Sequence, residues 1–185
     1  ALRTAAYYNR LHMAQLLHDS GTVDAQTGRS QETALTAAAS RGHEAVARLL
    51  LENGADEIIT VRGTALHAAS AGGHDAVVRS VIESGADVNA RGERYGTPLQ
   101  AASAEGGHDA VVLLLLDNGA DINAEGGPYG TALGAASLMG HDATVRLLTE
   151  RGADVNALDE KYGTPLQTAL TQGHVAIIRL LMVHG

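Results

Sequence analysis

The sequence contains no cysteine, tryptophan or phenylalanine, and five tyrosines are its only large aromatic residues. The absence of cysteine excludes disulfide bonds, thiolate metal sites and cysteine nucleophiles. Yet 45% of the residues are hydrophobic, mostly alanine, leucine and valine. Small alanines and long leucines at helical spacing suit closely packed helices. We therefore expect a helical protein whose core has no large aromatic centre.

The chain also has little positive charge, because 13 lysines and arginines stand against 21 acidic residues, for a net charge of −8. Affinity for nucleic acid comes largely from clustered lysine and arginine, so we expect no nucleic acid among the partners. The longest apolar run, residues 110–116, is far shorter than the ~20 residues of a membrane span. We expect no membrane contact and a cytoplasmic, intracellular location.

What the sequence does have is an internal repeat. The leucine of a Thr-x-Leu triplet recurs every 31 to 34 residues, and Leu2 continues the series without its threonine. A histidine follows each leucine after eight or nine residues, except in the first unit, and a glycine follows after 19 or 20. The leucines are Leu35, Leu66, Leu99, Leu133 and Leu166, the histidines are His43, His74, His108, His141 and His174, and the last glycine is Gly185. Six units in one phase predict a solenoid.

Each unit is typical of a helix, a turn, a second helix and an extended finger. Thr97-Pro98-Leu99 predicts a helix start, since threonine caps free N–H groups and proline is tolerated at the first helical position. Glycines such as Gly73 predict the left-handed end of the first helix. The second helices carry apolar residues at helical spacing, which places Leu114 and Leu148 in the core.

The segments TPLQAAS (97–103), GHDAVV (107–112) and NGADINA (118–124) resemble the ankyrin repeat. The resemblance implies an all-α solenoid of six helix-turn-helix units with projecting β-hairpin-like fingers, as one domain over 1–185. The expected units are approximately 1–27, 28–60, 61–91, 92–125, 126–158 and 159–185. The residue after the leucine departs from the usual histidine, which stands only at His67; elsewhere it is Thr36, Gln100, Gly134 or Gln167. The YGTxLQAAS motif is similar to the repeats of fungal ankyrin arrays, such as those of intracellular NTPase receptors.

Repeat arrays leave an extended concave face for partners. The resemblance implies that partner contacts come from the ends of the first helices and from the finger tips. The expected partner-binding residues are Tyr7, Tyr8, Arg41, Arg91, Arg94, Glu105, Leu138, Met139 and Gln172. A structural alternative is that Tyr7 and Tyr8 pack against a preceding neighbour. Another is that Arg91 and Arg94 are solvated tips. The recurring Tyr95, Tyr129 and Tyr162 are interpreted as packing along the finger row.

The histidines and acidic residues do not predict a metal site or a catalytic site. Five histidines occupy one repeat position, so successive copies lie one unit apart and should not converge on a metal ion. Their expected role is a hydrogen bond at a helix start. No G-x-S-x-G elbow and no phosphate loop occurs. We expect no catalytic residue, no metal and no cofactor, and so no enzyme.

The leading hypothesis is a monomeric scaffold or sensor module that binds another protein on its concave face. The alternative is a regulatory or structural arm of a larger enzyme or NTPase receptor, without a partner of its own. Two irregularities should disturb the stacking: a short finger with Ile58 and Ile59, and an extra residue near Glu105 and Gly106. Because the chain stops at Gly185, where a finger should begin, we expect a piece of a longer protein.

Overall fold

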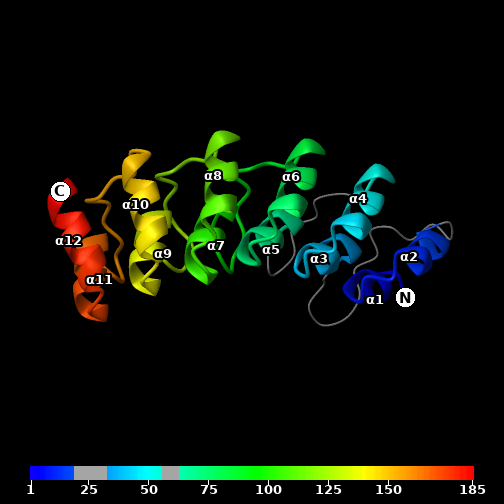
Figure 1. Cartoon of the computed structure of the whole chain (residues 1–185), viewed down its shortest axis with the longest axis horizontal. Helices are drawn as coiled ribbons and strands as arrows, with labels where there is room; N and C mark the ends of the chain where they lie inside the picture. Colours follow the sequence, from blue (N-terminus) through cyan, green and yellow to red (C-terminus); the bar gives the residue numbers. More distant parts are fainter. Residues whose placement is uncertain (19–32, 56–62) are drawn as a thin grey trace.

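The computed structural model describes residues 1–18, 33–55 and 63–185, and within these it contains twelve α-helices that follow one another in pairs (Figure 1). The pairs are α1 (Leu2–Tyr7) with α2 (Leu11–His18), α3 (Ala34–Ala39) with α4 (Glu44–Glu52), α5 (Ala65–Ala71) with α6 (Asp75–Glu83), α7 (Pro98–Glu105) with α8 (Asp109–Asp117), α9 (Ala132–Met139) with α10 (Asp142–Glu150), and α11 (Pro165–Gln172) with α12 (Val175–His184). They are numbered here as pairs 1 to 6.

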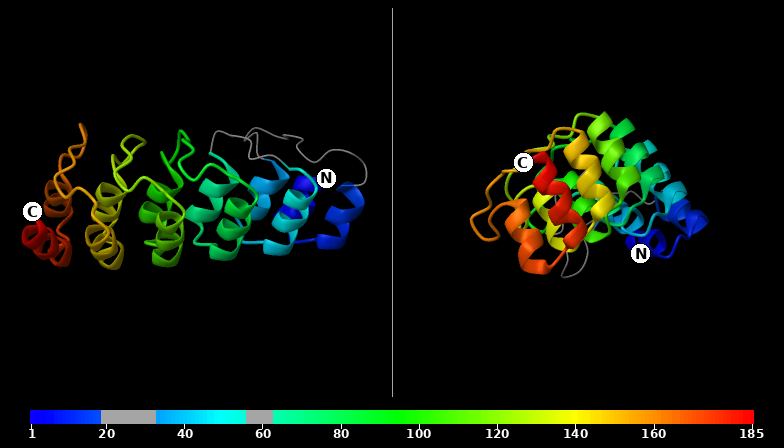
Figure 2. Two further views of the ribbon diagram at one scale, coloured as in Figure 1. Left: turned by 90° about the horizontal axis from the view of Figure 1, so that it is seen from above. Right: turned by 60° about the vertical axis from the view of Figure 1, so that its left-hand side comes forward.

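The pairs stack side by side in a shallow arc, with the odd-numbered helices along its inner side and the even-numbered helices along its outer side (Figure 1). The described loops between successive pairs project together from one edge of the stack (Figure 2). These loops include the fingers 90–96, 124–130 and 157–163. Two fingers close through isolated antiparallel bridges, Gly92 with Gly96 and Asp159 with Gly163. The predicted class, an all-α solenoid with hairpin-like fingers, is confirmed.

The inner helices begin where the sequence predicts. The side chain of Thr97 accepts a hydrogen bond from the N–H of Gln100, and Pro98 is the first helical residue of α7. The threonines before α3, α9 and α11 accept the same bond from the third helical residue. Each of these caps satisfies an N–H that has no partner within the helix. The capping threonine thus sets the start of the helix that carries the concave face.

Glycines with positive φ end the helices, as predicted. Gly73 has φ of +69°, and a Cβ atom there would overlap the imidazole ring of His108 from the next pair. Gly173 has φ of +76°, and in this structure nothing lies within 4 Å of a Cβ atom placed there. Gly73 is therefore required both by the backbone and by the neighbouring pair, whereas Gly173 is required by the backbone alone.

The core is a continuous row of aliphatic side chains between inner and outer helices. Leu35, Leu66, Leu99 and Leu133 are buried on the inner helices, and small alanines between them let neighbouring helices approach. On the outer helices Leu148 is fully buried, as predicted. In α8, however, the equivalent core position is Leu115, and Leu114 is only partly buried. The prediction for Leu114 was one residue out of register.

The extra residue near Glu105 and Gly106, where a local irregularity is expected, changes the turn between α7 and α8. The N–H of His108 donates to the carbonyl of Ala102, six residues earlier, whereas the N–H of His74 donates to Ala69, five residues earlier. The turn between α7 and α8 therefore widens by one residue and absorbs the insertion. The short finger that carries Ile58 and Ile59 lies outside the described residues.

Candidate functional site

The repeated histidines connect successive pairs. Each begins an outer helix, but its ring makes no capping bond there. Instead the Nε2 atom lies 3.0 to 3.4 Å from a carbonyl oxygen near the end of the inner helix of the preceding pair, and the Nε2–H group donates to that oxygen. The bonds join His43 to Tyr7, His74 to Ser40, His108 to Ala71, His141 to Ala104 and His174 to Leu138. The predicted helix-start hydrogen bond is thus corrected to a bond between pairs.

These bonds hold the ends of the inner helices, where most of the predicted partner-binding residues lie. At the first of these ends, the rings of Tyr7 and Tyr8 pack edge to face with centroids 5.1 Å apart. The guanidinium of Arg41, from the turn after α3, lies 4.1 Å from the centroid of the Tyr7 ring. Tyr8 remains 64% exposed. Pairs 1 and 2 thus present an aromatic and cationic cluster to solvent.

A second cluster lies on pair 4. The Arg94 guanidinium is 4.9 Å from the Tyr95 ring centroid and 3.7 Å from the Glu105 carboxylate. A hollow of about 210 Å³ lies beside it, lined by Tyr95 and Glu105 together with residues of α3 and α5. Tyr95 is buried, in line with its interpretation as a packing residue. Arg94 and Glu105 therefore lie together at a depression shared by three inner helices.

The remaining predicted partner-binding residues differ in their solvent exposure and in their contacts with the rest of the chain. Arg91 donates from Nη1 to the carbonyl of Glu125 at 2.7 Å, so its charged group is engaged with the next finger. Leu138 is partly buried, while Met139 is 41% exposed at the end of α9. Gln172 is exposed at the end of α11. The structure brings Tyr7, Tyr8 and Arg41 together, and Arg94 with Glu105; the others are spread along the same row.

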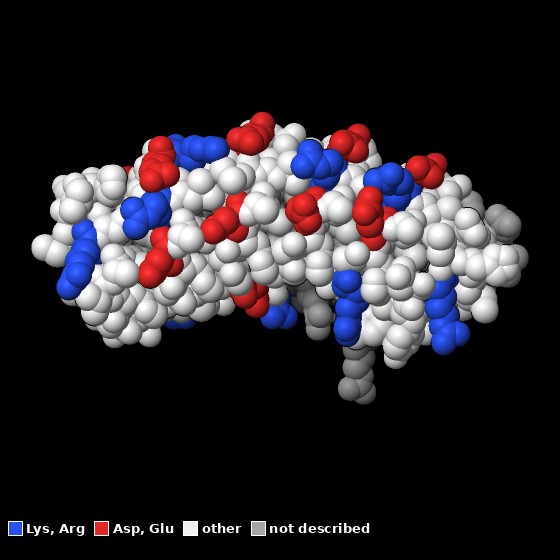
Figure 3. Space-filling model, viewed as in Figure 1, with Lys and Arg blue, Asp and Glu red and all other residues white. Residues whose placement is uncertain are grey.

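The outer helices present a different surface. Acidic and basic side chains alternate along it without a field of one sign (Figure 3). Arg48 pairs with Glu44 on α4 at 2.7 Å, and Arg151 pairs with Asp117 of the preceding pair at 3.2 Å. Both ion pairs are exposed, and exposed pairs contribute only ~0–1 kcal/mol. This face is typical of a solvated surface.

A feature that the sequence analysis did not predict lies between the fingers. In pairs 3 and 4 the residue after the inner leucine, at the third helical position, reaches from its own helix to the next finger. The Nε2 atom of Gln100 donates to the carbonyls of Ala124 and Gly126 at 2.8 and 3.2 Å, and also to that of Gly130. Its Oε1 accepts from the N–H of Thr97 at 2.7 Å. Gln100 thus joins the start of its own helix to finger 124–130.

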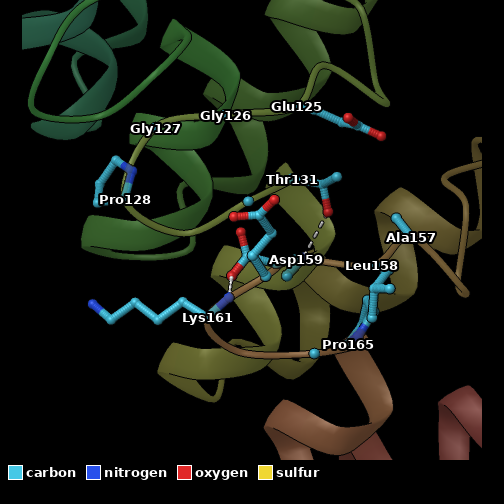
Figure 4. Close-up of a pocket in the computed structure, with 14 residues that line it drawn as sticks. Glu125, Gly126, Gly127, Pro128, Thr131, Ala157, Leu158, Asp159, Lys161 and Pro165 are labelled. Carbon is cyan, nitrogen blue, oxygen red and sulfur yellow. Dashed lines mark hydrogen bonds between the residues drawn. The ribbon is translucent and has the colours of Figure 1, made fainter.

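His67 does the same one pair earlier. Its Nδ1 accepts from the N–H of Thr64 at 3.2 Å, and its Nε2 donates to the carbonyl of Gly96 at 2.9 Å. In pair 5 the position is Gly134, which has no side chain to make either bond. A hollow of about 450 Å³ opens there between fingers 124–130 and 157–163 (Figure 4). The irregular residue after the leucine was the sequence signal for this feature.

Two of the histidines have lowered pKa values. Burial lowers the pKa of His67, against the opposing effect of its hydrogen bonds to the backbone of Gly96 and Ala90. Burial, followed by the positive charge of Arg41, lowers the pKa of His43. Both shifts favour the neutral imidazole in the folded protein. On finger 157–163, the side-chain hydrogen bond with Tyr162 raises the pKa of the exposed Lys161.

The described residues contain no group of three or more His, Asp or Glu side chains placed to hold a metal ion. Within the same residues, no helix is long and apolar enough to cross a membrane. The candidate site is a surface: the exposed ends of the inner helices together with the adjoining fingers. An arrangement of this kind defines a helical-repeat solenoid with an extended exposed face.

Comparison with known proteins identifies the repeat. A family model described as ankyrin repeats (3 copies) matches residues 56–126, and one described as ankyrin repeats (many copies) matches residues 2–51, 35–74 and 132–182. The chain therefore belongs to the ankyrin-repeat family. It is similar to the crystal structure of the human ASB11 ankyrin repeat domain, with 33% identity and a TM-score of 0.88, over 100% of this chain and 83% of that one. The comparison with curated proteins gave no match.

Ankyrin repeats generally mediate protein–protein interactions, and proteins of the family are typically non-catalytic adaptors. Neither matching family model is a catalytic one. The comparisons do not support the more specific resemblance to fungal arrays or to NTPase receptors.

Proposed function

We propose that this chain is a non-catalytic interaction module that binds another protein on the inner side of its arc. One observation carries the proposal: Tyr8 and Met139, 64% and 41% exposed, lie at equivalent ends of inner helices four pairs apart. Aromatic and flexible apolar side chains of this kind are enriched at the centres of protein interfaces. The outer helices α4, α6, α8 and α10, which are all described, carry mixed charges and expose no large hydrophobic side chain, whereas the outer helices of the end pairs expose Met13 and Met182.

The shape of the face favours an extended contact. Arg41 on the Tyr7 ring and Arg94 on the Tyr95 ring are both held by their aromatic neighbours. A held arginine loses less side-chain entropy on binding than a free one. With a net charge of −8 on the chain, these arginines would be local anchors for acidic groups of a partner. A monomeric, cytoplasmic protein is part of the proposal.

The test is capture of a partner from an extract of cells that express the full-length protein, with this chain as bait. Met139→Glu should abolish capture, because it places a charge in the middle of the proposed interface. Arg146→Gln is the matched control, because it changes the net charge by the same amount on an exposed residue of outer helix α10. Circular dichroism should show unchanged helicity in both variants. Capture that Met139→Glu leaves intact, or that Arg146→Gln also removes, would place the interface elsewhere.

A further inference from the structure

The hollow at Gly134 corresponds to the place of a missing side chain. Gln100 in pair 4 and His67 in pair 3 occupy the same repeat position, and both bridge a capping threonine and the next finger. In pair 5 the capping threonine is Thr131, whose side chain accepts from the N–H of Gly134 at 3.1 Å. The next finger is 157–163. Between them the bridging side chain is absent.

The polar groups that such a side chain would meet are nevertheless present. Gln100 donates to the carbonyls of Ala124, Gly126 and Gly130. One repeat later, 33 residues on, these positions are Ala157, Asp159 and Gly163, and all three line the hollow. Thr131 and Gly134 line its opposite wall. The segments 125–128 and 157–161 face each other across it (Figure 4).

The two walls of the hollow favour different hydrogen-bonding groups. At the inner wall, the N–H of Thr131 occupies the repeat position of the Thr97 N–H, which donates to Gln100. Both N–H groups lie at the start of a helix, where an acceptor oxygen is favoured. At the finger wall, the carbonyls of Asp159 and Gly163 each accept from the other residue's N–H, and the second lone pair of each oxygen favours a further donor. Glu125, Asp159 and Glu160 surround the opening, against one cation, Lys161. A carboxylate would suit only the inner wall, and a guanidinium or ammonium group only the finger wall.

A primary carboxamide suits both walls, because it carries an acceptor oxygen and two N–H donors on one planar group. It is also the group that fills the same position in pair 4. The hollow of about 450 Å³ holds more than one such group, so it admits a side chain together with part of the segment that presents it.

We propose that the hollow at Gly134 is a recognition pocket for a glutamine side chain presented by a partner polypeptide, which takes the place that Gln100 fills in the preceding pair. A free amino acid would bring a carboxylate close to Glu125, Asp159 and Glu160, whereas a peptide would not. The polypeptide source rests on the proposed protein-binding function; the chemistry of the pocket does not.

The test is a titration of the ¹⁵N-labelled chain with N-acetyl-glutamine methylamide, followed by NMR. Saturable shifts are expected at the amides of Thr131, Gly134 and Gly163. The glutamate and arginine analogues, and free glutamine, should bind at least tenfold more weakly. Gly134→Gln should abolish the shifts, because the added carboxamide occupies the pocket. A Cβ at this position would lie 3.0 Å from the carbonyl oxygen of Tyr129, so Gly134→Ala, which adds this Cβ but no carboxamide, is the control and should keep the shifts.

The absence of saturable shifts at these amides would overturn the proposal, as would equal binding of the glutamate or arginine analogue. Shifts that persist in folded Gly134→Gln would overturn it as well. Tighter binding of free glutamine than of the capped form would overturn the polypeptide source. None of these measurements uses the partner, so their failure is distinct from capture that survives Met139→Glu.

Discussion

Replacing Gln100 with alanine should be among the most damaging single changes in the chain, although the residue is polar. Gln100 is 1% exposed and makes hydrogen bonds through both ends of its carboxamide. Removing it leaves the N–H of Thr97 and the finger carbonyls without this partner. Each buried polar group left unpaired costs ~1–3 kcal/mol. Since the carbonyls are partly relieved by water, we expect a total loss of about 3–5 kcal/mol.

Gln167 provides the matched control at the same repeat position. Its Oε1 accepts from the N–H of Thr164 at 2.9 Å, but the residue is exposed and no finger follows it in the structure. Gln167→Ala makes the same chemical change and should cost only ~0.5–1.5 kcal/mol, the net contribution of one hydrogen bond. The difference between the two variants isolates the contribution of the contact with the finger.

Urea unfolding followed by circular dichroism would measure both losses. Repeat arrays need not unfold in a single step, so hydrogen exchange should accompany it. In Gln100→Ala, exchange should accelerate first in finger 124–130 and at Thr97. If Gln100→Ala cost no more than Gln167→Ala, the bridging role of the side chain, and with it the interpretation of the Gly134 hollow as its vacant counterpart, would be wrong.

Three further predictions concern the core, the histidines and the turns. Leu115→Ala should cost ~2–5 kcal/mol through cavity formation, and Leu114→Ala less than half of that; equal losses in urea unfolding would contradict the assigned register. The pKa of His67 is lowered in the folded state, so as the pH falls the unfolded chain binds the proton before the folded chain does. The contribution of His67 to the free energy of unfolding is therefore complete above pH ~6.5 and declines as the pH falls below it. His67→Gln should reduce this acid sensitivity, and identical pH profiles of thermal unfolding would count against it. Gly73→Ala should lower the melting temperature more than Gly173→Ala, since both force a left-handed residue but only Gly73 faces a neighbouring ring.

Most of the fold can be predicted from the sequence because the same residues recur at nearly fixed spacing, so each unit shows where the elements of the next unit begin and end. The recurring leucines and glycines place helices, turns and fingers, and the capping threonines lie where the pattern predicts. The register within α8 was missed because Leu113 to Leu116 form an unbroken run, which fits any helical phase. Only alignment with Leu148 or the structure itself selects Leu115 as the buried residue.

The contacts between pairs were harder to predict. The sequence shows that the histidines recur, but not that each ring reaches back to the preceding inner helix. Likewise, Gly134 stood out as a departure from the pattern, while its consequence depends on where the next finger lies. The partner-binding role of Tyr8, Met139 and the other exposed residues remains a prediction, since the free chain shows their exposure and not their use.

The side-chain bonds between pairs run in two directions, and this gives the array uneven cooperativity. Histidines bind backwards to the preceding pair, while Gln100 and Asn123 bind forwards, Asn123 by accepting from the N–H of Asp154 at 2.8 Å. Pairs 4 and 5 are therefore coupled from both sides. Among the described residues, the side-chain hydrogen bond that joins pairs 5 and 6 is that of His174 to Leu138.

In a chain of nearest-neighbour couplings, the weakest link decides how far an opening event spreads. We therefore expect pair 6 to open and reclose while the order of pairs 3 to 5 persists. A ligand bridging that link would extend the cooperative unit to the last pair.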